Sequence, residues 1–167
     1  MSIARFEKVS MDRFVTDSVG LGLQTNAVKR FKTVISLPKR ATKHSAGYDF
    51  VSPYNLCIAP GETVFLPTGI RCWMDPNWVL MLYPRSSMGF KGLRLANTTG
   101  VIDADYYEAK NEGHIMAKLV NDGPCEIRIN AGDRFMQGVF VQYGLAEEEG
   151  VVDERKNGTG VEQEMKQ

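Results

Sequence analysis

Two short segments of the sequence carry side chains suited to the chemistry of a phosphate ester, and the first is Pro84-Arg85-Ser86-Ser87-Met88-Gly89. It directly follows the apolar run 78–83. Arginine presents a planar fork of donors to phosphate oxygens, and serine hydroxyls and backbone N–H groups can add further hydrogen bonds. Considered alone, the segment is better explained as a polar turn whose arginine pairs with a carboxylate.

The second segment is Asn97-Thr98-Thr99-Gly100-Val101-Ile102-Asp103-Ala104-Asp105-Tyr106-Tyr107. We expect a hairpin that exposes backbone donors and acceptors at its mouth, as a base-reading pocket requires. On an extended chain Asp103 and Asp105 would share one face, because side chains alternate along a strand. A carboxylate near an anionic substrate can hold and deprotonate a water molecule. A charged turn with aromatic cover is nevertheless the favoured explanation of the segment by itself.

Two further polar segments border apolar runs, Ala46-Gly47-Tyr48-Asp49-Phe50 and Gly132-Asp133-Arg134-Phe135-Met136-Gln137. Gly-Asp fits a tight turn, and Arg134 can pair locally. Each is an ordinary hairpin when it is considered alone, so only the order of all four segments carries information about function.

The elements that must position these residues are predicted to be short strands. Between residues 34 and 144, apolar runs alternate with Gly, Pro, Asn and Asp at a spacing of about 8–12 residues, which is typical of an all-β barrel or jelly roll. No useful helix-period segment is found there. We therefore predict a β domain over residues 34–144.

The flanking regions differ from this domain. Residues 1–33 are predicted to form a short helical or irregular N-terminal arm. One face of its helix would carry Phe6, Met11, Phe14 and Val15. Residues 145–167 are polar and rich in glutamate, which predicts a flexible C-terminal arm. The length of 167 residues suits one domain, and 43% hydrophobic residues suffice for a buried core.

Composition excludes several classes of protein. Twenty Lys+Arg balance twenty Asp+Glu, which argues against a protein that mainly coats nucleic acid or an anionic membrane. The three cysteines form no CxxC pair and His44 and His114 stand alone, so we expect neither a disulfide framework nor a thiolate metal cage. No signal peptide and no run of about 20 apolar residues is present. We expect a cytoplasmic protein without nucleic-acid or membrane partners.

Taken together, four segments resemble the successive motifs of the trimeric deoxyuridine triphosphate nucleotidohydrolases, or dUTPases. They are Ser45-Ala46-Gly47-Tyr48-Asp49-Phe50, Pro84-Arg85-Ser86-Ser87-Met88-Gly89, Gly100-Val101-Ile102-Asp103-Ala104-Asp105-Tyr106 and Ala131-Gly132-Asp133-Arg134-Phe135-Met136-Gln137. The resemblance covers residues 34–144. One match would be weak, but four in the correct order are a specific signal.

The resemblance implies a distorted jelly-roll β-barrel that assembles as a homotrimer, with active sites shared between subunits. It also implies hydrolysis of dUTP to dUMP and pyrophosphate with Mg²⁺ bound to the phosphates. Asp103 would be the general base that activates the attacking water. Tyr106 would pack against the deoxyribose, and Asp49 would approach the metal through water. The remaining substrate-binding positions would be Arg85, Ser86, Ser87, Asn97, Gly100, Ile102, Gln137 and Arg155.

Two departures from the family pattern keep alternatives open. Arg85-Ser86-Ser87 replaces the Arg-Ser-Gly of many members and is similar to the related dCTP deaminases, although Lys118 stands near the place of their catalytic glutamate. The tail lacks the phenylalanine that stacks on uracil in the family. Arg155 and Gly158-Thr159-Gly160 could form a shortened closing arm, and a disordered acidic tail is an equal explanation. A non-catalytic deoxynucleotide sensor on the same fold is the remaining alternative.

Overall fold

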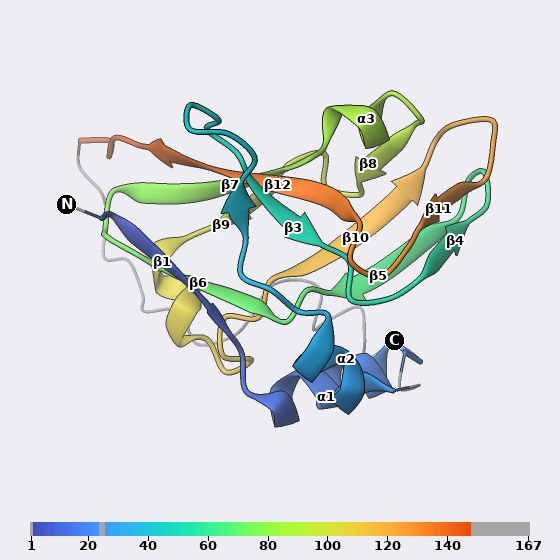
Figure 1. Cartoon of the computed structure of the whole chain (residues 1–167). Coiled ribbons are helices and arrows are strands. Elements are labelled where there is room, and N and C mark those ends of the chain that lie inside the picture. Colours follow the sequence, from blue (N-terminus) through green and yellow to red (C-terminus); the bar gives the residue numbers. More distant parts are fainter. Residues whose placement is uncertain (1, 24–25, 148–167) are drawn as a thin grey trace.

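The computed structural model describes residues 2–23 and 26–147, and most of its regular structure is β-strand (Figure 1). The largest sheet has the strand order β2 (Lys39–Arg40), β3 (Tyr48–Val51), β12 (Arg134–Gln142), β7 (Trp78–Pro84) and β9 (Gly100–Ile102). A second sheet has the order β5 (Thr63–Pro67), β10 (Met116–Asn121) and β8 (Leu93–Leu95). Two strand pairs complete the β structure: β1 (Ala4–Lys8) with β6 (Ile70–Met74), and β11 (Ile127–Ile129) with β4 (Leu56–Ile58). The prediction of a β fold of the jelly-roll type is confirmed.

Helical elements are short in the described ranges. They are α1 (Met11–Gly20), α2 (Ala27–Thr33), the single turn α3 (Ser86–Gly89) and the 3-10 helix η1 (Ala104–Glu108). Figure 1 shows α1 and α2 together at one end of the molecule, beneath the strands. Within residues 2–23 and 26–147, no helix has the length and apolar character needed to cross a bilayer.

The strands form where buried and exposed side chains alternate. In β11, Ile127 and Ile129 are buried while Arg128 between them is exposed. The two isoleucines belong to a single hydrophobic cluster that also contains Leu80 of β7 and Phe135 of β12. Full burial of one such side chain contributes about 1.5–3 kcal/mol to folding. This shared core fixes the sheets relative to one another.

Strand β12 organises the polar residues of the largest sheet because it lies between β3 and β7. Its Gln137 is opposite Asp49 on one side and Tyr83 on the other. The register therefore brings two segments that are distant in sequence, around Asp49 and Arg85, to the two sides of the same strand. Both segments belong to the four whose order carries the resemblance in the sequence.

The N-terminal region departs from the prediction of a helix face that includes Phe6. Phe6 lies in β1, opposite Cys72 of β6, and its ring contacts Phe50 in an edge-on arrangement at 5.7 Å. The chain turns into α1 only at Ser10, whose hydroxyl accepts from the Arg13 N–H at 3.0 Å and caps the helix. Phe14 of α1 is fully buried. Residues 4–8 therefore pair with β6 as a strand, although the spacing of their apolar residues suggested a helix. The N-terminal region packs on the hydrophobic core. The predicted domain boundaries at 33 and 144 stay a prediction.

Candidate active site

A pocket of about 340 Å³ gathers most of the predicted anion-binding residues, and we call it the Arg85 pocket. Its lining consists of Ala41, Ser45, Gly47, Asp49, Arg85, Ser86, Ser87 and Gln137. These residues come from β3 and the segment before it, the turn after β7 and the middle of β12. Four of the predicted site residues and the predicted metal-associated residue, Asp49, therefore converge in one cavity.

The centre of the Arg85 pocket is a carboxylate between two guanidinium groups. Asp49 is 9% exposed, and its oxygens pair with Arg85 Nε at 3.0 Å and Arg134 Nη1 at 3.2 Å. The backbone N–H of Arg85 donates to the Phe135 carbonyl at 3.1 Å, which anchors the turn to β12. The partner that the simpler explanation assigned to Arg85 is present, and it lies in the same pocket as the hydroxyls of the turn. Arg134 pairs with a residue 85 positions away and not locally.

Gly47 and Gln137 share a close contact in this pocket. A Cβ atom at Gly47 would lie 2.4 Å from Gln137 Oε1. The Gln137 side chain also donates from Nε2 to the Pro84 carbonyl at 3.4 Å. Gly47 thus leaves space for the carboxamide, and a larger residue there would have to displace it. Ser86 and Ser87 are exposed on the first turn of α3.

Asp103 lies in a different and larger pocket of about 620 Å³, here called the Asp103 pocket. Its lining consists of Trp73, Met74, Pro76, Asp103, Ala104, Asp105 and Tyr143. Asp103 is the residue that precedes η1 and has extended backbone angles, after which the chain winds into a 3-10 helix. The expectation that Asp103 and Asp105 share one face of a strand is wrong, because the strand ends at Ile102. Both residues still line the same cavity.

The other predicted nucleoside-binding residues are not part of the lining of this pocket. Tyr106 is 3% exposed, and its hydroxyl donates to the His114 carbonyl at 2.8 Å while accepting from Asn111 Nδ2 at 2.7 Å. Gly100 and Ile102 are buried in β9 against β7. Asn97 is exposed in the turn before β9.

The predicted hairpin around Asn97 does not form as a regular ladder. Strand β8 pairs with β10, whereas β9 pairs with β7, so the two strands enter different sheets. Only an isolated bridge joins Leu95 and Thr98, and Thr98 has a left-handed φ of 66°. The segment is a tight turn between sheets, which still presents backbone groups to solvent.

The two pockets are far apart within one chain. Ile102 pairs with Leu80 near one end of β7, and Arg85 follows the other end. At about 3.3 Å per residue, this register places Asp103 and Arg85 roughly 20 Å apart. Figure 1 agrees, since α3 and the coil that follows β9 lie on opposite sides of the molecule.

Several lining residues had no signal in the sequence. Trp73 and Met74 end β6, Pro76 lies just after it, and Tyr143 directly follows β12. They lie at least 27 residues from Asp103 in the sequence or beyond the last motif, so only the folded chain brings them to the cavity. Met74 and Trp73 pair with β1, which the sequence had assigned to an arm.

Comparison with known proteins agrees with the order of the motifs. A family model described as dUTPase matches residues 33–163. The deoxyuridine 5'-triphosphate nucleotidohydrolase of Lactococcus lactis subsp. lactis (strain IL1403) is 42% identical over 138 residues, which cover 80% of this chain and 92% of that relative. The protein of the same name from Pseudomonas fluorescens (strain Pf0-1) is 39% identical over 137 residues, covering 78% and 87%.

A solved structure gives the same result at the level of the fold. The crystal structure of dUTPase from Streptococcus mutans is 38% identical to this chain and has a TM-score of 0.63. The similarity covers 85% of this chain and 98% of the solved one. Because the family model spans well over half of the sequence and the relatives are similar over most of their length, the chain belongs to the dUTPase family.

Proposed function

We propose that this protein hydrolyses dUTP to dUMP and pyrophosphate. The observation that carries the proposal is the division of labour between its two pockets. One offers two carboxylates among aromatic and apolar side chains, and the other offers an arginine, three serine hydroxyls, a carboxamide and a carboxylate. Family membership supplies the substrate, because the curated relatives are named for this reaction.

Asp103 is proposed as the general base. It would accept a proton from a water molecule while the water oxygen bonds to the α-phosphorus. The bond from the α-phosphorus to the bridging oxygen breaks in the same displacement, and pyrophosphate leaves with that oxygen. The position of Asp103 at the start of η1, on the wall of a cavity, supports this role. If the water and the nucleotide are both bound in the reactive orientation, the reaction between them becomes an effectively unimolecular step.

The donors of the Arg85 pocket are proposed to bind the phosphate chain. Arg85 would bind two oxygens at once, and Ser86, Ser87 and Gln137 would donate single hydrogen bonds. Asp49 is proposed to orient the arginine through their 3.0 Å ion pair. Arg155, the remaining predicted phosphate contact, lies outside the described residues.

Magnesium is proposed to arrive with the nucleotide and not to occupy a protein cage. Across residues 2–23 and 26–147, no group of three or more His, Cys, Asp or Glu side chains is arranged to hold a metal ion. Asp49 is already paired with Arg85 and Arg134, so its contact to the metal is proposed to run through water. When bound to the phosphates, Mg²⁺ neutralises charge on their oxygens.

The turn at Asn97 and strand β9 are proposed to select the nucleoside. Backbone groups near Asn97, Gly100 and Ile102 would pair with uracil, and a cytosine would leave some of them unpaired, which discriminates strongly. Tyr106 is proposed to disfavour a 2′-hydroxyl with its ring. Its hydroxyl is fixed by two hydrogen bonds, which supports a fixed position of the ring.

We further propose a homotrimer whose sites are shared between subunits. Roughly 20 Å separates Asp103 from Arg85 in one chain, and strand β7 between them keeps this distance fixed. A single nucleotide would reach both residues more readily if they came from neighbouring copies.

The three cysteines are free thiols, which supports action in the reducing cytoplasm.

The central experiment is an assay of the purified protein with Mg²⁺ and a panel of dUTP, dCTP and dTTP, in which pyrophosphate and ammonia are measured together. Pyrophosphate from dUTP alone is the expected result. Normal binding of dUTP without product would contradict the proposal and favour a sensor. Ammonia from dCTP would favour a deaminase, although the corresponding strand carries Lys118, whose ammonium lies 4.9 Å from the centre of the Phe65 ring.

Shared sites are tested by mixing two inactive variants. Asp103→Asn and Arg85→Ala subunits are co-expressed, so that some sites receive Asp103 from one subunit and Arg85 from its neighbour. In random trimers about a quarter of the sites would be intact, and that fraction of activity should return. No recovery beyond the two variants alone would show that each site uses both residues of one chain.

A further inference from the structure

Segment 103–115 carries two residues of the proposed site but has little regular structure of its own. Between η1 and Ile115, its backbone hydrogen bonds close short turns, such as Glu112 N–H to the Ala109 carbonyl at 2.8 Å, and Ile115 at its end donates to the Ile70 carbonyl at 2.8 Å. Glu112 and Gly113 both have left-handed backbone angles, with φ of 61° and 65°. A segment with few ladder hydrogen bonds opens easily unless contacts from elsewhere hold it. The structure shows where those contacts come from.

The first contact joins β1 to η1. Glu7 accepts a hydrogen bond from the Tyr107 hydroxyl at 2.6 Å. The same carboxylate pairs with Arg71 Nε of β6 at 3.2 Å and with Arg5 Nε at 2.6 Å. Arg71 lies over the Tyr107 ring, 3.8 Å from its centre, and also contacts the Tyr107 hydroxyl. Tyr107 is thus held from two strands by one carboxylate and one guanidinium group.

The second contact joins the start of α1 to the left-handed turn. The backbone N–H and the hydroxyl of Ser10 both donate to the Glu112 carboxylate, each at 2.7 Å. These hydrogen bonds lower the pKa of Glu112, although burial opposes them. Ser10 also caps α1, so the residue that begins the helix holds the turn in the catalytic segment as well.

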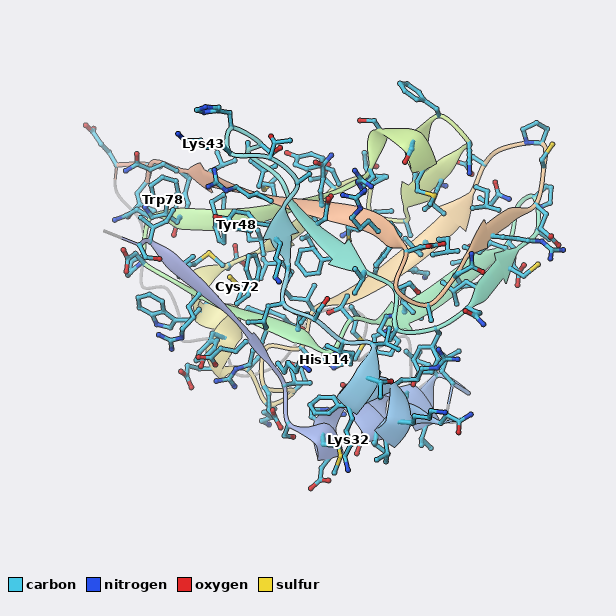
Figure 2. The ribbon with its side chains drawn as sticks, viewed as in Figure 1. Lys32, Lys43, Tyr48, Cys72, Trp78 and His114 are labelled. Atoms are coloured by element: carbon cyan, nitrogen blue, oxygen red, sulfur yellow. The ribbon has the colours of Figure 1, made fainter. Side chains whose placement is uncertain are left out.

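The third contact is buried and leads to Tyr106. His114 is fully buried and accepts at Nε2 from the Gly69 N–H at 2.8 Å, so its Nδ1 donates to Asp17 of α1 at 2.6 Å. Arg13 binds both oxygens of the Asp17 carboxylate, including the Oδ2 that accepts from His114. Figure 2 shows His114 at the boundary between the helices and the strands. The carbonyl of this same histidine accepts the Tyr106 hydroxyl.

Strand β1 also supports the part of the Asp103 pocket that β6 forms. It pairs with β6 so that Ala4 is opposite Met74 and Arg5 is opposite Trp73, the two residues that β6 contributes to the Asp103 pocket. The Arg5 guanidinium lies 5.3 Å from the centre of the Trp73 ring. The N-terminal segment therefore contacts both walls of the cavity without lining it.

We propose that residues 4–18 act as a clamp that fixes segment 103–115, with Glu7 and Asp17 as positioning residues for Asp103 and Tyr106. The clamp rests on the proposed function, and it lies before the region that the family model matches. Neither residue lines the Arg85 pocket or the Asp103 pocket, so each acts through another side chain, Glu7 through Tyr107 and Asp17 through His114. A displacement of about 1 Å in a catalytic group can cost up to 100-fold in rate.

The test uses Glu7, which is partly exposed and can be replaced without leaving a buried charge unpaired. Full-length Glu7→Ala, Tyr107→Phe and the double variant are assayed for dUTP hydrolysis with kcat and KM determined separately. We expect each single change to lower kcat about tenfold with KM within about threefold, since it misplaces a catalytic group. The double variant should lose no more than either single variant, because both act through one contact. Glu7→Gln, whose amide oxygen still accepts from Tyr107, should restore most of kcat.

The matched control is Glu126→Ala, which removes an exposed ion pair of the same length to Arg128, at 2.6 Å, away from both pockets. Amide hydrogen exchange over residues 103–115 is compared in Glu7→Ala and the control. Faster exchange in Glu7→Ala alone, together with lower kcat, supports the clamp; unchanged exchange or unchanged kcat overturns it. If the wild-type protein does not hydrolyse dUTP, the proposed function fails, and the exchange comparison still decides whether Glu7 fixes the segment.

Discussion

The Arg85 pocket and the Asp103 pocket are built in different ways. The first is assembled on regular strands, where the register of β12 sets Gln137 opposite Asp49 and next to the turn of Arg85. The second depends on η1, a single irregular turn that is held from outside by Glu7 and His114. A site on strands is fixed by the sheet itself, whereas a site on an irregular turn inherits its precision from neighbouring elements. Activity should therefore respond mainly to substitutions of the lining residues in the Arg85 pocket. In the Asp103 pocket it should also respond to substitutions of residues outside the pocket, such as Glu7.

Asp103→Asn should have the largest effect, because it removes the proposed base and keeps its size. We expect kcat to fall by roughly 10²–10⁴-fold with little change in KM, as is typical for loss of general base catalysis. Pyrophosphate release under saturating dUTP and Mg²⁺ is the measurement. Asp105→Asn is the comparison in the same pocket and should cost less than tenfold. Equal losses in the two variants would show that the cavity needs negative charge and not a base at one position.

Arg85→Lys should come next, since it keeps the charge but loses the bidentate fork. We expect kcat/KM to fall by about 10–100-fold, mainly through KM, from the loss of one oriented hydrogen bond to phosphate. Arg134→Lys is the matched control, because Arg134 also pairs with Asp49 but does not line the pocket. Steady-state kinetics on dUTP distinguish the two. A loss in Arg134→Lys as large as in Arg85→Lys would assign the effect to the orientation of Asp49.

Gly47→Ala should give a smaller and local effect, since the new methyl group would meet Gln137 Oε1 at 2.4 Å. The carboxamide end is flexible and can move, so the fold should survive with its donor displaced. We expect KM to rise about threefold to tenfold, the cost of one weakened hydrogen bond. Gly89→Ala, where nothing lies within 4 Å of the added carbon, is the control. An unchanged KM in Gly47→Ala would remove Gln137 from the proposed phosphate contacts.

The same contrast explains what could be predicted from the sequence. The strands and the order of the motifs were readable, because alternation and turn residues are local signals, and Asp49, Arg85 and Gln137 indeed meet in one pocket. The face shared by Asp103 and Asp105 was predicted wrongly, since nothing local marks the end of β9. Phe6 was predicted to lie in a helix because the apolar spacing of about 3.6 residues is a local pattern. Its pairing with Cys72 joins two distant segments, which that pattern cannot report. The hydrogen bond between His114 and Asp17 joins residues 97 positions apart, so a pattern within a short sequence window cannot reveal it.

The smallest expected effect is on the free energy of unfolding. It comes from the contact of Glu7 with Tyr107, which supports the Asp103 pocket and involves no residue that lines the Arg85 pocket. The Tyr107 hydroxyl, followed by Arg5, holds the pKa of Glu7 at about 2, below its usual 4.5. A lowered pKa in the folded state stabilises the protein above pH 4.5, and this contribution disappears as the pH falls from there towards 2. Because the Glu7 side chain is 31% exposed, solvent screening limits the gain to about 1 kcal/mol. Chemical unfolding of wild type and Glu7→Gln should therefore differ by about that amount at pH 7 and converge as the pH approaches 2. A difference that stays constant between these pH values would mean that Glu7 acts by packing alone, and the clamp would then owe its hold on segment 103–115 to Ser10 and Asp17.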